Sequence, residues 1–263
     1  MMDSVTVITL TRGRIEMLKR ALHSVSSQDY PGQIKHLIII DDCPITKTFF
    51  ETSTGIEENF EWHLISREKT DKSGPAHVAK LRNYAVHAAA TEWISFLDDD
   101  NEFESNHISS LVSCAKQKEC KAVHSQMKIF WPDGTLYLDQ RMPWCRDIEE
   151  SKRYYVELCD KGVFQPGSNI VRDRADPLGY PDPARTVDAG EWLLARTLLL
   201  EYPFCTEYNN IDWKNVTTED DKLLQTLIEN RIPITSTEQP TLRYYLGGYS
   251  NNFESQGFGI PGK

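Results

Sequence analysis

The sequence lacks several features that would each point to a particular class of protein. Its six cysteines include no C-x-x-C pair and no regular spacing. Its longest apolar stretch, from Trp192 to Phe204, is interrupted by Arg196, Glu201 and Pro203, which excludes a membrane span there. The first residues have no basic region and no small-residue cleavage site, so we predict no signal peptide. We therefore expect reduced, mostly buried thiols in a cytoplasmic protein, with a peripheral contact to a membrane left open.

Positive charge is also scarce. The formal net charge is −10, which argues against a broad nucleic-acid-binding face but leaves room for a local basic pocket that takes a phosphorylated ligand. Apolar residues make up 40% of the 263 residues and charged residues 26%, and no segment is low in complexity. The composition is that of an ordinary globular protein with a sizeable core.

The first hundred residues alternate between strand and helix patterns. β-branched or apolar runs predict strands, and apolar residues at helical spacing predict helices between them. The expected strands are 5–10, 36–40, 62–66 and 93–97, and the expected helices are 15–25 and 76–90. This order predicts an α/β fold with a mostly parallel central sheet flanked by helices.

The second half is less regular. We predict a hairpin over 121–141, because the triplet Pro-Asp-Gly at 132–134 is a turn signal, and a turn at 164–169 before a short strand at 170–171. A loop rich in proline and aspartate is expected over 176–185. Two helices are expected, over 188–200 and 218–230, the second capped by Thr217 or Thr218.

The most informative feature is the acidic triplet Asp98, Asp99 and Asp100, directly behind the predicted strand 93–97. Carboxylates this close repel one another, and such clusters usually persist because a cation or a donor-rich ligand neutralises them. Hard oxygen ligands favour Mg²⁺ or Mn²⁺. The plainer alternative is an acidic turn that caps a helix starting near Ser105.

Polar residues also follow the other predicted strands. Thr9 to Arg14 follow the first strand, and Asp41 and Asp42 follow the second. Ligands of open α/β sheets bind at the carboxyl ends of the strands, so we expect these groups and the acidic triplet to form one site.

In this order and spacing, the sequence resembles a family 2 glycosyltransferase with a GT-A fold, the fold of nucleotide-diphospho-sugar transferases. The matching segments thread through roughly residues 4–247. They are VTVITLTRGR (5–14), LIIIDD (37–42), AKLRNYAV (79–86), ISFLDDDN (94–101), FQPGSN (164–169) and TEDDKLLQTL (218–227). The resemblance implies inverting transfer of a sugar from a nucleotide-diphosphate donor, most often a UDP- or dTDP-sugar, to a hydroxyl acceptor.

The resemblance also assigns roles to the donor side. Asp98 and Asp100 match the DxD element, in which Asp98 contacts the ribose and Asp100 holds the Mg²⁺ or Mn²⁺ that bridges the diphosphate. The remaining matches to nucleotide-binding positions are Thr9, Thr11, Arg14, Asp41, Asp42, Arg82, Asn83 and Asp99. Each of these residues alone also has a plain structural explanation, such as a solvated helix position or a turn.

Two positions compete for the general base. Glu219 and Asp220 resemble the family's ED pair, whose aspartate deprotonates the acceptor hydroxyl, and the alternative is that these acids only cap their helix. Asp188 and Glu191 lie closer to the 164–169 turn and are the rival pair, although Trp192 then stands where an aspartate is expected. We favour Asp220 and leave the rival open.

The acceptor side is less defined. The residues offered for it are Gly167, Ser168, Asn169, Glu191 and Trp192. No repeat or linker divides the chain, so we expect one domain over 1–263, with a nucleotide-sugar half over about 1–125, an acceptor half over about 126–248, and a flexible tail or lid over 249–263.

One departure from the resemblance concerns the metal. Many GT-A enzymes take a further metal ligand from a histidine near the C-terminus, but the last histidine here is His124. This keeps a catalytically degenerate, glycosyltransferase-like binding protein as an alternative. A nucleotidyltransferase is the other alternative, although the loop Thr11 to Arg14 has one glycine where such enzymes carry several.

Overall fold

The structure is a computed structural model that describes residues 3–53, 60–68, 74–175 and 186–248. The predicted loop at 176–185 and the predicted tail or lid at 249–263 lie outside the described residues.

The first half follows the predicted alternation of strands and helices. Each predicted strand and helix is present within a few residues of its expected bounds, and one further helix, α2, follows the second strand. The elements are β1 (Val5–Thr11), α1 (Ile15–Ser26), β2 (Ile34–Asp41), α2 (Pro44–Thr52), β3 (Phe60–Ile65), α3 (Pro75–Ala88) and β4 (Trp93–Phe96). The helix pattern that begins near Ser105 becomes α4 (His107–Lys118), which Asn106 precedes without a side-chain cap, so the acidic triplet does not cap this helix.

The second half contains short elements between longer ones. They are β5 (Glu102–Phe103), β6 (Ala122–Phe130), α5 (Ile148–Asp160), β7 (Ile170–Val171), β8 (Trp192–Ala195), α6 (Arg196–Glu201), α7 (Asn210–Lys214), α8 (Glu219–Glu229) and β9 (Ile234–Tyr245). Thr218 caps α8, as predicted, because its hydroxyl accepts from the backbone N–H of Asp221.

Two predictions for this half need correction. The helix expected over 188–200 is wrong in its first part, because 189–191 form a 3₁₀ turn and 192–195 form β8, which pairs with β4 and β6. An apolar run of this length is compatible with either a strand or a helix, and pairing on both sides decides it. The hairpin over 121–141 reduces to β6, a turn, and one antiparallel bridge between Phe130 and Leu136.

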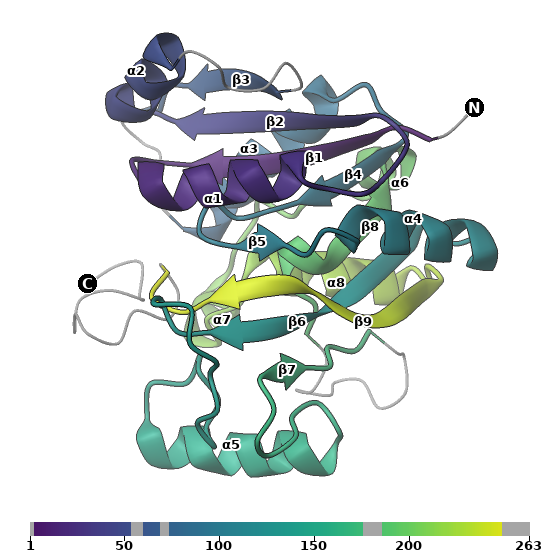
Figure 1. The fold of residues 1–263 in the computed structure, drawn as a ribbon. Coiled ribbons are helices and arrows are strands. Elements are labelled where there is room, and N and C mark those ends of the chain that lie inside the picture. Colours follow the sequence, from purple (N-terminus) through teal and green to yellow (C-terminus); the bar gives the residue numbers. More distant parts are fainter. Residues whose placement is uncertain (1–2, 54–59, 69–73, 176–185, 249–263) are drawn as a thin grey trace.

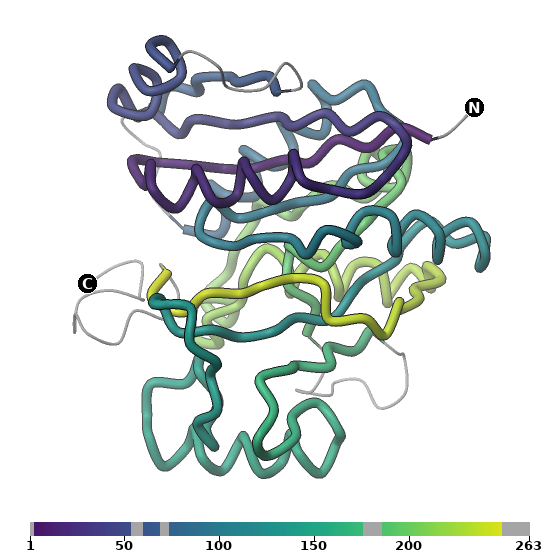
Figure 2. The backbone as a smooth tube through the Cα atoms, in the orientation of Figure 1, coloured from purple at the N-terminus to yellow at the C-terminus, as the bar shows by residue number. Residues whose placement is uncertain are grey.

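The described strands form one nine-stranded sheet in the order β3-β2-β1-β4-β8-β6-β9-β5, with β7 paired to β6 (Figure 1). The first four strands in this order are parallel, as predicted for the first half. β8 is antiparallel to both neighbours, and β6 and β9 are parallel, so the whole sheet is mixed. Figure 2 shows how β9, late in the chain, runs beside β6.

Helices cover both faces of the sheet, and each face has its own core. Successive residues of β2 point to opposite faces, with Leu37 and Ile39 packing into the core under α3, α6 and α8, and Ile38 and Ile40 packing against α1 and α2. A third set of buried residues lies around α4 and α5. β2 is buried on both faces, which explains why its sequence is a continuous apolar run.

The carboxyl ends of β1, β2 and β4 point the same way because these strands are parallel. The residues that follow these strands therefore gather at one edge of the sheet, on the left in Figure 1. Within the part of the chain that the structure describes, no helix has the length and apolar character needed to cross a membrane.

The burial of β2 gives a test of the core. Ile39 is fully buried, whereas Ile45 on α2 is 69% exposed. We expect Ile39→Ala to lower the free energy of unfolding by about 2–5 kcal/mol, because it removes buried methyl groups and leaves a cavity. The matched variant Ile45→Ala is expected to change it by less than about 0.5 kcal/mol. Urea denaturation measures both, and equal effects would contradict this account of the core.

Candidate active site

The acidic triplet lies at the carboxyl end of β4. The chain leaves the sheet after Phe96, and the backbone N–H of Asn101 donates to the carbonyl of Asp98, which closes a turn. The turn gives its three carboxylates different environments. The Asp99 side chain is fully buried, that of Asp100 is 12% exposed, and that of Asp98 is 39% exposed. Asp98 is thus the most accessible member of the triplet.

Arg14 neutralises part of this charge. It lies in the loop between β1 and α1, where Gly13 has a positive φ of 78° that lets the backbone turn back toward β4. Its guanidinium forms ion pairs with Asp99 and with Asp100, the latter at 2.6 Å. Burial raises the pKa of Asp99 to about 6, although the Arg14 charge and the hydroxyl of Thr11 act against the shift. The resemblance placed Thr11 and Arg14 near the donor, and the structure brings both beside the triplet.

A second guanidinium, that of Arg82 on α3, connects the triplet to α8. Arg82 is 3% exposed and lies 3.4 Å from Asp98 and 3.1 Å from Glu219, and it also pairs with Asp220. Its guanidinium carbon is 5.4 Å from the ring centroids of both Phe96 and Phe204. The interactions of Arg82 therefore bring together acids that are more than 100 residues apart in the sequence.

The three acids at the start of α8 have different partners. Asp221 completes the capping box, since its carboxylate accepts from the backbone N–H of Thr218 at 2.8 Å. Glu219 and Asp220 take no part in this capping box and instead form ion pairs with Arg82. Burial raises the pKa of Glu219 to about 8 and that of Asp220 to about 6, outweighing the Arg82 charge that both share. Capping alone therefore does not explain Glu219 and Asp220.

The structure places Asp188 and Glu191, the rival pair, in different surroundings. Glu191 is fully buried, and its carboxylate accepts from the backbone N–H of Asp188 at 3.0 Å, which ties the 3₁₀ turn together. Asp188 lies close enough to the cluster for Asp98 and Asp220, after burial, to raise its pKa well above the ordinary value. Asp188 thus belongs to the acidic cluster, whereas Glu191 stabilises the 3₁₀ turn.

A second group of polar residues lies at the ends of β2 and β3. The guanidinium of Arg67 pairs with both oxygens of Asp41, with Nε 2.7 Å from Oδ1, and Nε2 of His77 lies 3.0 Å from the same Oδ1. Burial alone would raise the pKa of Asp41, but the hydrogen bonds from Arg67 and His77 outweigh it and hold the pKa below its ordinary value. Asp41 is therefore an ionised carboxylate held in a fixed orientation.

Other residues named from the sequence have different surroundings. Asp42 is exposed, with a positive φ of 46°. Thr9 is fully buried, and its hydroxyl lies 2.8 Å from Nε2 of His36 on β2. Asn83 bonds both the N–H and the C=O of Phe204 at 2.9 Å, which fixes one of the rings beside Arg82. The structure thus brings neither Thr9 nor Asn83 into the charged cluster. Asn83 instead holds the backbone of Phe204, whose ring lies beside Arg82.

The acceptor-side residues do not form one group. Trp192 is fully buried in β8 against His124, so its assignment to the acceptor side needs correction. Gly167 and Ser168 lie in the turn before β7, where Ser168 Oγ accepts from the N–H of Ile170. Asn169 is bound to the backbone of Ile129 on β6. These three residues are at the edge of the sheet that carries α5, apart from the acidic cluster.

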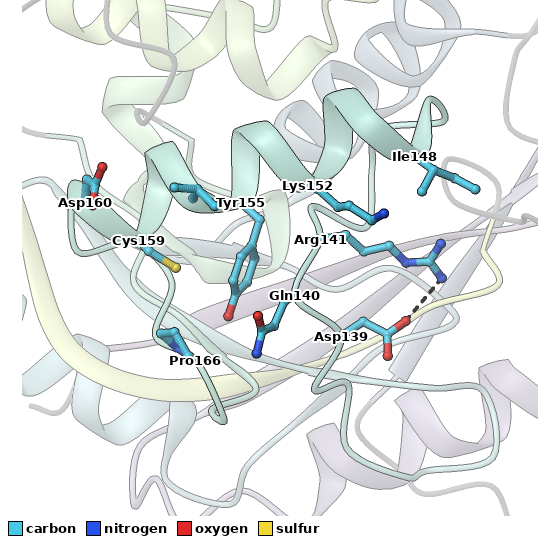
Figure 3. Close-up of a pocket in the computed structure, with 10 residues that line it drawn as sticks. Asp139, Gln140, Arg141, Ile148, Lys152, Tyr155, Cys159, Asp160 and Pro166 are labelled. Atoms are coloured by element: carbon cyan, nitrogen blue, oxygen red, sulfur yellow. Dashed lines mark ion pairs between the residues drawn. The ribbon is translucent and has the colours of Figure 1, made fainter.

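A groove lies along α5, next to this turn. Figure 3 shows Tyr155, Cys159 and Pro166 on one side of it and the ion pair between Asp139 and Arg141 on the other. None of the acids of the triplet or of α8 lines this groove. Its position gives it no direct part in the chemistry of the acidic cluster.

The oxygen ligands of the acidic cluster suit Mg²⁺ or Mn²⁺ held jointly by the protein and by a bound ligand. Within the described residues, no group of three or more His, Cys, Asp or Glu side chains forms a ready-made metal site. The five carboxyl groups of Asp98, Asp99, Asp100, Glu219 and Asp220 share the guanidinium groups of Arg14 and Arg82. This surplus of hard oxygen ligands suits a cation that takes one or two carboxylates from the protein and its other ligands from phosphates and water.

Sequence reasoning missed Arg67, His77 and Phe204. Arg67 was accessible to the rule that ligands bind where strands end, because it follows the predicted strand 62–66 directly. His77 and Phe204 carry no such signal, since one begins a helix and the other lies in an apolar stretch far along the chain.

The raised pKa of Glu219 predicts how stability depends on pH. In the unfolded chain this carboxyl loses its proton near pH 4.5, whereas in the folded protein it keeps the proton to about pH 8. Its contribution to the free energy of unfolding therefore decreases as the pH rises between these values. We expect Glu219→Gln, which stays neutral, to gain stability relative to the parent chain from pH 5 to pH 8. Urea denaturation without metal measures this, and a difference independent of pH would contradict the assignment.

The chain is similar to known proteins. A relative from Bacillus subtilis (strain 168), assigned as the teichuronic acid biosynthesis glycosyltransferase TuaG, is 26% identical over 133 residues, which are 50% of this chain and 49% of TuaG. The chain thus spans about half the length of this curated relative.

Solved structures resemble the whole described fold. The crystal structure of S. aureus TarS 1-349 in complex with UDP-GlcNAc matches 96% of this chain and 61% of its own, with a TM-score of 0.58 and 12% identity. The mannosyltransferase PcManGT from Pyrobaculum calidifontis, in complex with GDP-Man and Mn²⁺, matches 91% of this chain and 56% of its own, with a TM-score of 0.55 and 14% identity. At such identities the likeness concerns the fold, and it confirms the predicted GT-A fold.

The family itself is shown by the sequence. The model of the family described as "Glycosyl transferase family 2" matches residues 4–176, which include β1, the acidic triplet and the turn before β7. This match covers well over half of the chain. The chain therefore belongs to glycosyl transferase family 2.

Proposed function

We propose that the protein is a metal-dependent, inverting glycosyltransferase that moves a sugar from a UDP- or dTDP-sugar to a hydroxyl acceptor. The observation that carries this proposal is the pairing of two acidic groups through Arg82. Asp98, at the end of β4, and Asp220, at the start of α8, contact the same guanidinium. A donor bound at the triplet would therefore place its reacting carbon near a carboxylate able to act as a base.

The donor's diphosphate and metal belong with the triplet. Asp100, with Asp98, would hold Mg²⁺ or Mn²⁺ together with the diphosphate oxygens, and the bound metal would neutralise charge on the departing nucleoside diphosphate. Arg14 is placed to assist because its guanidinium already faces Asp99 and Asp100. The TarS and PcManGT complexes support this arrangement, since both contain a nucleotide sugar and one contains Mn²⁺.

The surroundings of Asp41 favour uracil or thymine as the base. Arg67 takes one site on each oxygen of Asp41, and His77 takes a second site on Oδ1. Arg12 lies 4.0 Å from Oδ2, beyond hydrogen-bond distance, so among the described residues Oδ2 keeps one acceptor site. A single imide N–H, as in uracil or thymine, fits this one site. Guanine presents two neighbouring donors that need both oxygens, so a GDP-sugar fits less well.

Asp220 is the general base in this proposal. Its carboxylate is 18% exposed at the first turn of α8 and would take the proton from the acceptor hydroxyl as that oxygen attacks the anomeric carbon. Asp188, in the same cluster, remains the alternative base. Inversion follows from a single displacement, and it rests on the resemblance to the family.

The acceptor is a hydroxyl on a glycan, a lipid-linked intermediate or a natural product. The name of TuaG, which refers to teichuronic acid biosynthesis, is in keeping with a glycan acceptor. A catalytically degenerate binding protein is less well supported, because Asp98, Glu219 and Asp220 are all present and contact the same guanidinium of Arg82. Family membership argues against a nucleotidyltransferase.

The first test is nucleotide binding with and without metal. At a nucleotide concentration of about 100 times the dissociation constant, binding adds about 2.7 kcal/mol, which raises the melting temperature by roughly 5–10 °C. We expect UDP or dTDP with Mn²⁺ to give such a shift, GDP and CDP to give less, and EDTA to remove most of it. Asp100→Ala is expected to lose the metal-dependent part, whereas Asp29→Ala, which removes an exposed acid away from the site, is expected to keep it. No shift with any nucleotide would count against the proposal.

The second test separates binding from transfer. We expect Asp220→Asn to retain the nucleotide-induced shift and to lower kcat by about 10²–10⁴-fold, because the amide cannot accept the proton. Asp221→Asn is the matched control, since its carboxylate caps α8, and we expect it to retain kcat within about threefold. Release of nucleoside diphosphate measures both. Full activity of Asp220→Asn would transfer the role to Asp188.

A further inference from the structure

The segment between α6 and α8 carries a tyrosine whose side chain is held tightly. The ring of Tyr208 lies 5.4 Å from the ring of Trp213, centroid to centroid, and Nζ of Lys222 lies 4.4 Å from the centroid of Tyr208. Lys222 is on the first turns of α8 and bonds Asp212 on α7 at 2.8 Å. Trp213 packs near Gly74, at the start of α3. Tyr208 is thus held against Lys222 of α8 and against Trp213, which lies near the start of α3.

The hydroxyl of Tyr208 has no use in the ligand-free fold. Its oxygen is buried and has no hydrogen-bond partner among the described residues. Glu219 and Asp220 are among the charged groups that act on it most strongly, and together with burial they raise the pKa of the phenol, so the hydroxyl keeps its proton. A buried donor without a partner lowers stability, and native structures rarely keep one without a reason.

We propose that Tyr208 is a further substrate-binding residue of this active site, whose hydroxyl donates a hydrogen bond to a sugar oxygen at the reaction centre. This inference rests on the proposed function, because it takes Asp220 to mark the place where the sugar is transferred. It assigns a role to a residue in a segment for which the sequence offered no motif.

The chemistry around the phenol favours a sugar oxygen. Glu219 and Asp220 already share the guanidinium of Arg82, whereas the phenol of Tyr208 has no hydrogen-bond partner among the described residues. A sugar presents several hydroxyl and ring oxygens that accept such a bond. The bond would go to an oxygen other than the attacking one, since donation to the nucleophile would oppose its deprotonation by Asp220. We assign the partner oxygen to the donor's sugar.

Tyr208→Phe tests this directly, because phenylalanine keeps the ring between Trp213 and Lys222 and removes only the hydroxyl. We expect the ligand-free variant to melt at the same temperature as the parent chain or higher, because the lost hydroxyl had no partner. We expect nucleoside diphosphate release from UDP-glucose, UDP-GlcNAc or dTDP-glucose, with Mn²⁺ and water as acceptor, to fall at least tenfold. Unchanged stability with lost activity is the signature of a group kept for the substrate.

Calorimetric titration with UDP and with the UDP-sugar tests which part of the donor the hydroxyl contacts. We expect Tyr208→Phe to weaken binding of the UDP-sugar at least fivefold and to leave UDP binding unchanged, because UDP lacks the sugar oxygen.

Tyr137→Phe is the matched control. The hydroxyl of Tyr137 donates to the carbonyl of Arg141 at 2.9 Å, and its ring packs on Trp131, outside the acidic cluster. We expect this variant to melt at a lower temperature and to retain activity within twofold, the reverse of Tyr208→Phe. The inference is overturned if Tyr208→Phe keeps its turnover or its UDP-sugar affinity within twofold, or if it loses UDP affinity equally. Failure of the proposed function would instead show in the parent chain, which would release no nucleoside diphosphate.

Discussion

The guanidinium of Arg82 lies against two phenylalanine rings and faces carboxylates from two distant parts of the chain. A guanidinium keeps its charge at any working pH, so its burial is tolerated only because carboxylates surround it. Those carboxylates are in turn held near one another only because Arg82 lies between them. The position of α3 relative to β4 and α8 therefore decides the geometry of the whole site, and Asn83 secures it by holding the backbone of Phe204.

Around this interaction the molecule keeps a surplus of negative charge. Burial raises the pKa values of Asp99, Glu219 and Asp220 against the opposing charges of Arg14 and Arg82, and these two guanidinium groups are the cationic partners that the carboxyl groups of the cluster share. A metal nucleotide would supply such a partner, since its cation brings positive charge to the triplet. The proposed nucleobase end is built differently, because Arg67 already neutralises Asp41, and Arg67 and His77 together orient it. One end of the proposed site is thus pre-organised, and the other is completed by its ligand.

Prediction from sequence succeeded where local pattern and tertiary structure agree. The run at 36–40 is apolar without interruption because β2 is buried on both faces, so its assignment needed no knowledge of its neighbours. The segment 192–195 was misjudged because Trp192 to Ala195 fit a helix or a strand equally well, and pairing with β4 and β6 decided the outcome. The same pairing buries Trp192, which removes it from the acceptor side.

The sequence by itself determined the parallel first half of the sheet, the acids that follow its strands, and the capping of α8 by Thr218, because each depends on residues close together in the chain. The tertiary structure alone decided that Arg82 joins Asp98 to Asp220, that Asp188 belongs to the cluster while Glu191 does not, and that the hydroxyl of Tyr208 has no partner among the described residues. These relations depend on contacts across more than 100 residues or on which face of a segment is buried, and local sequence patterns carry neither.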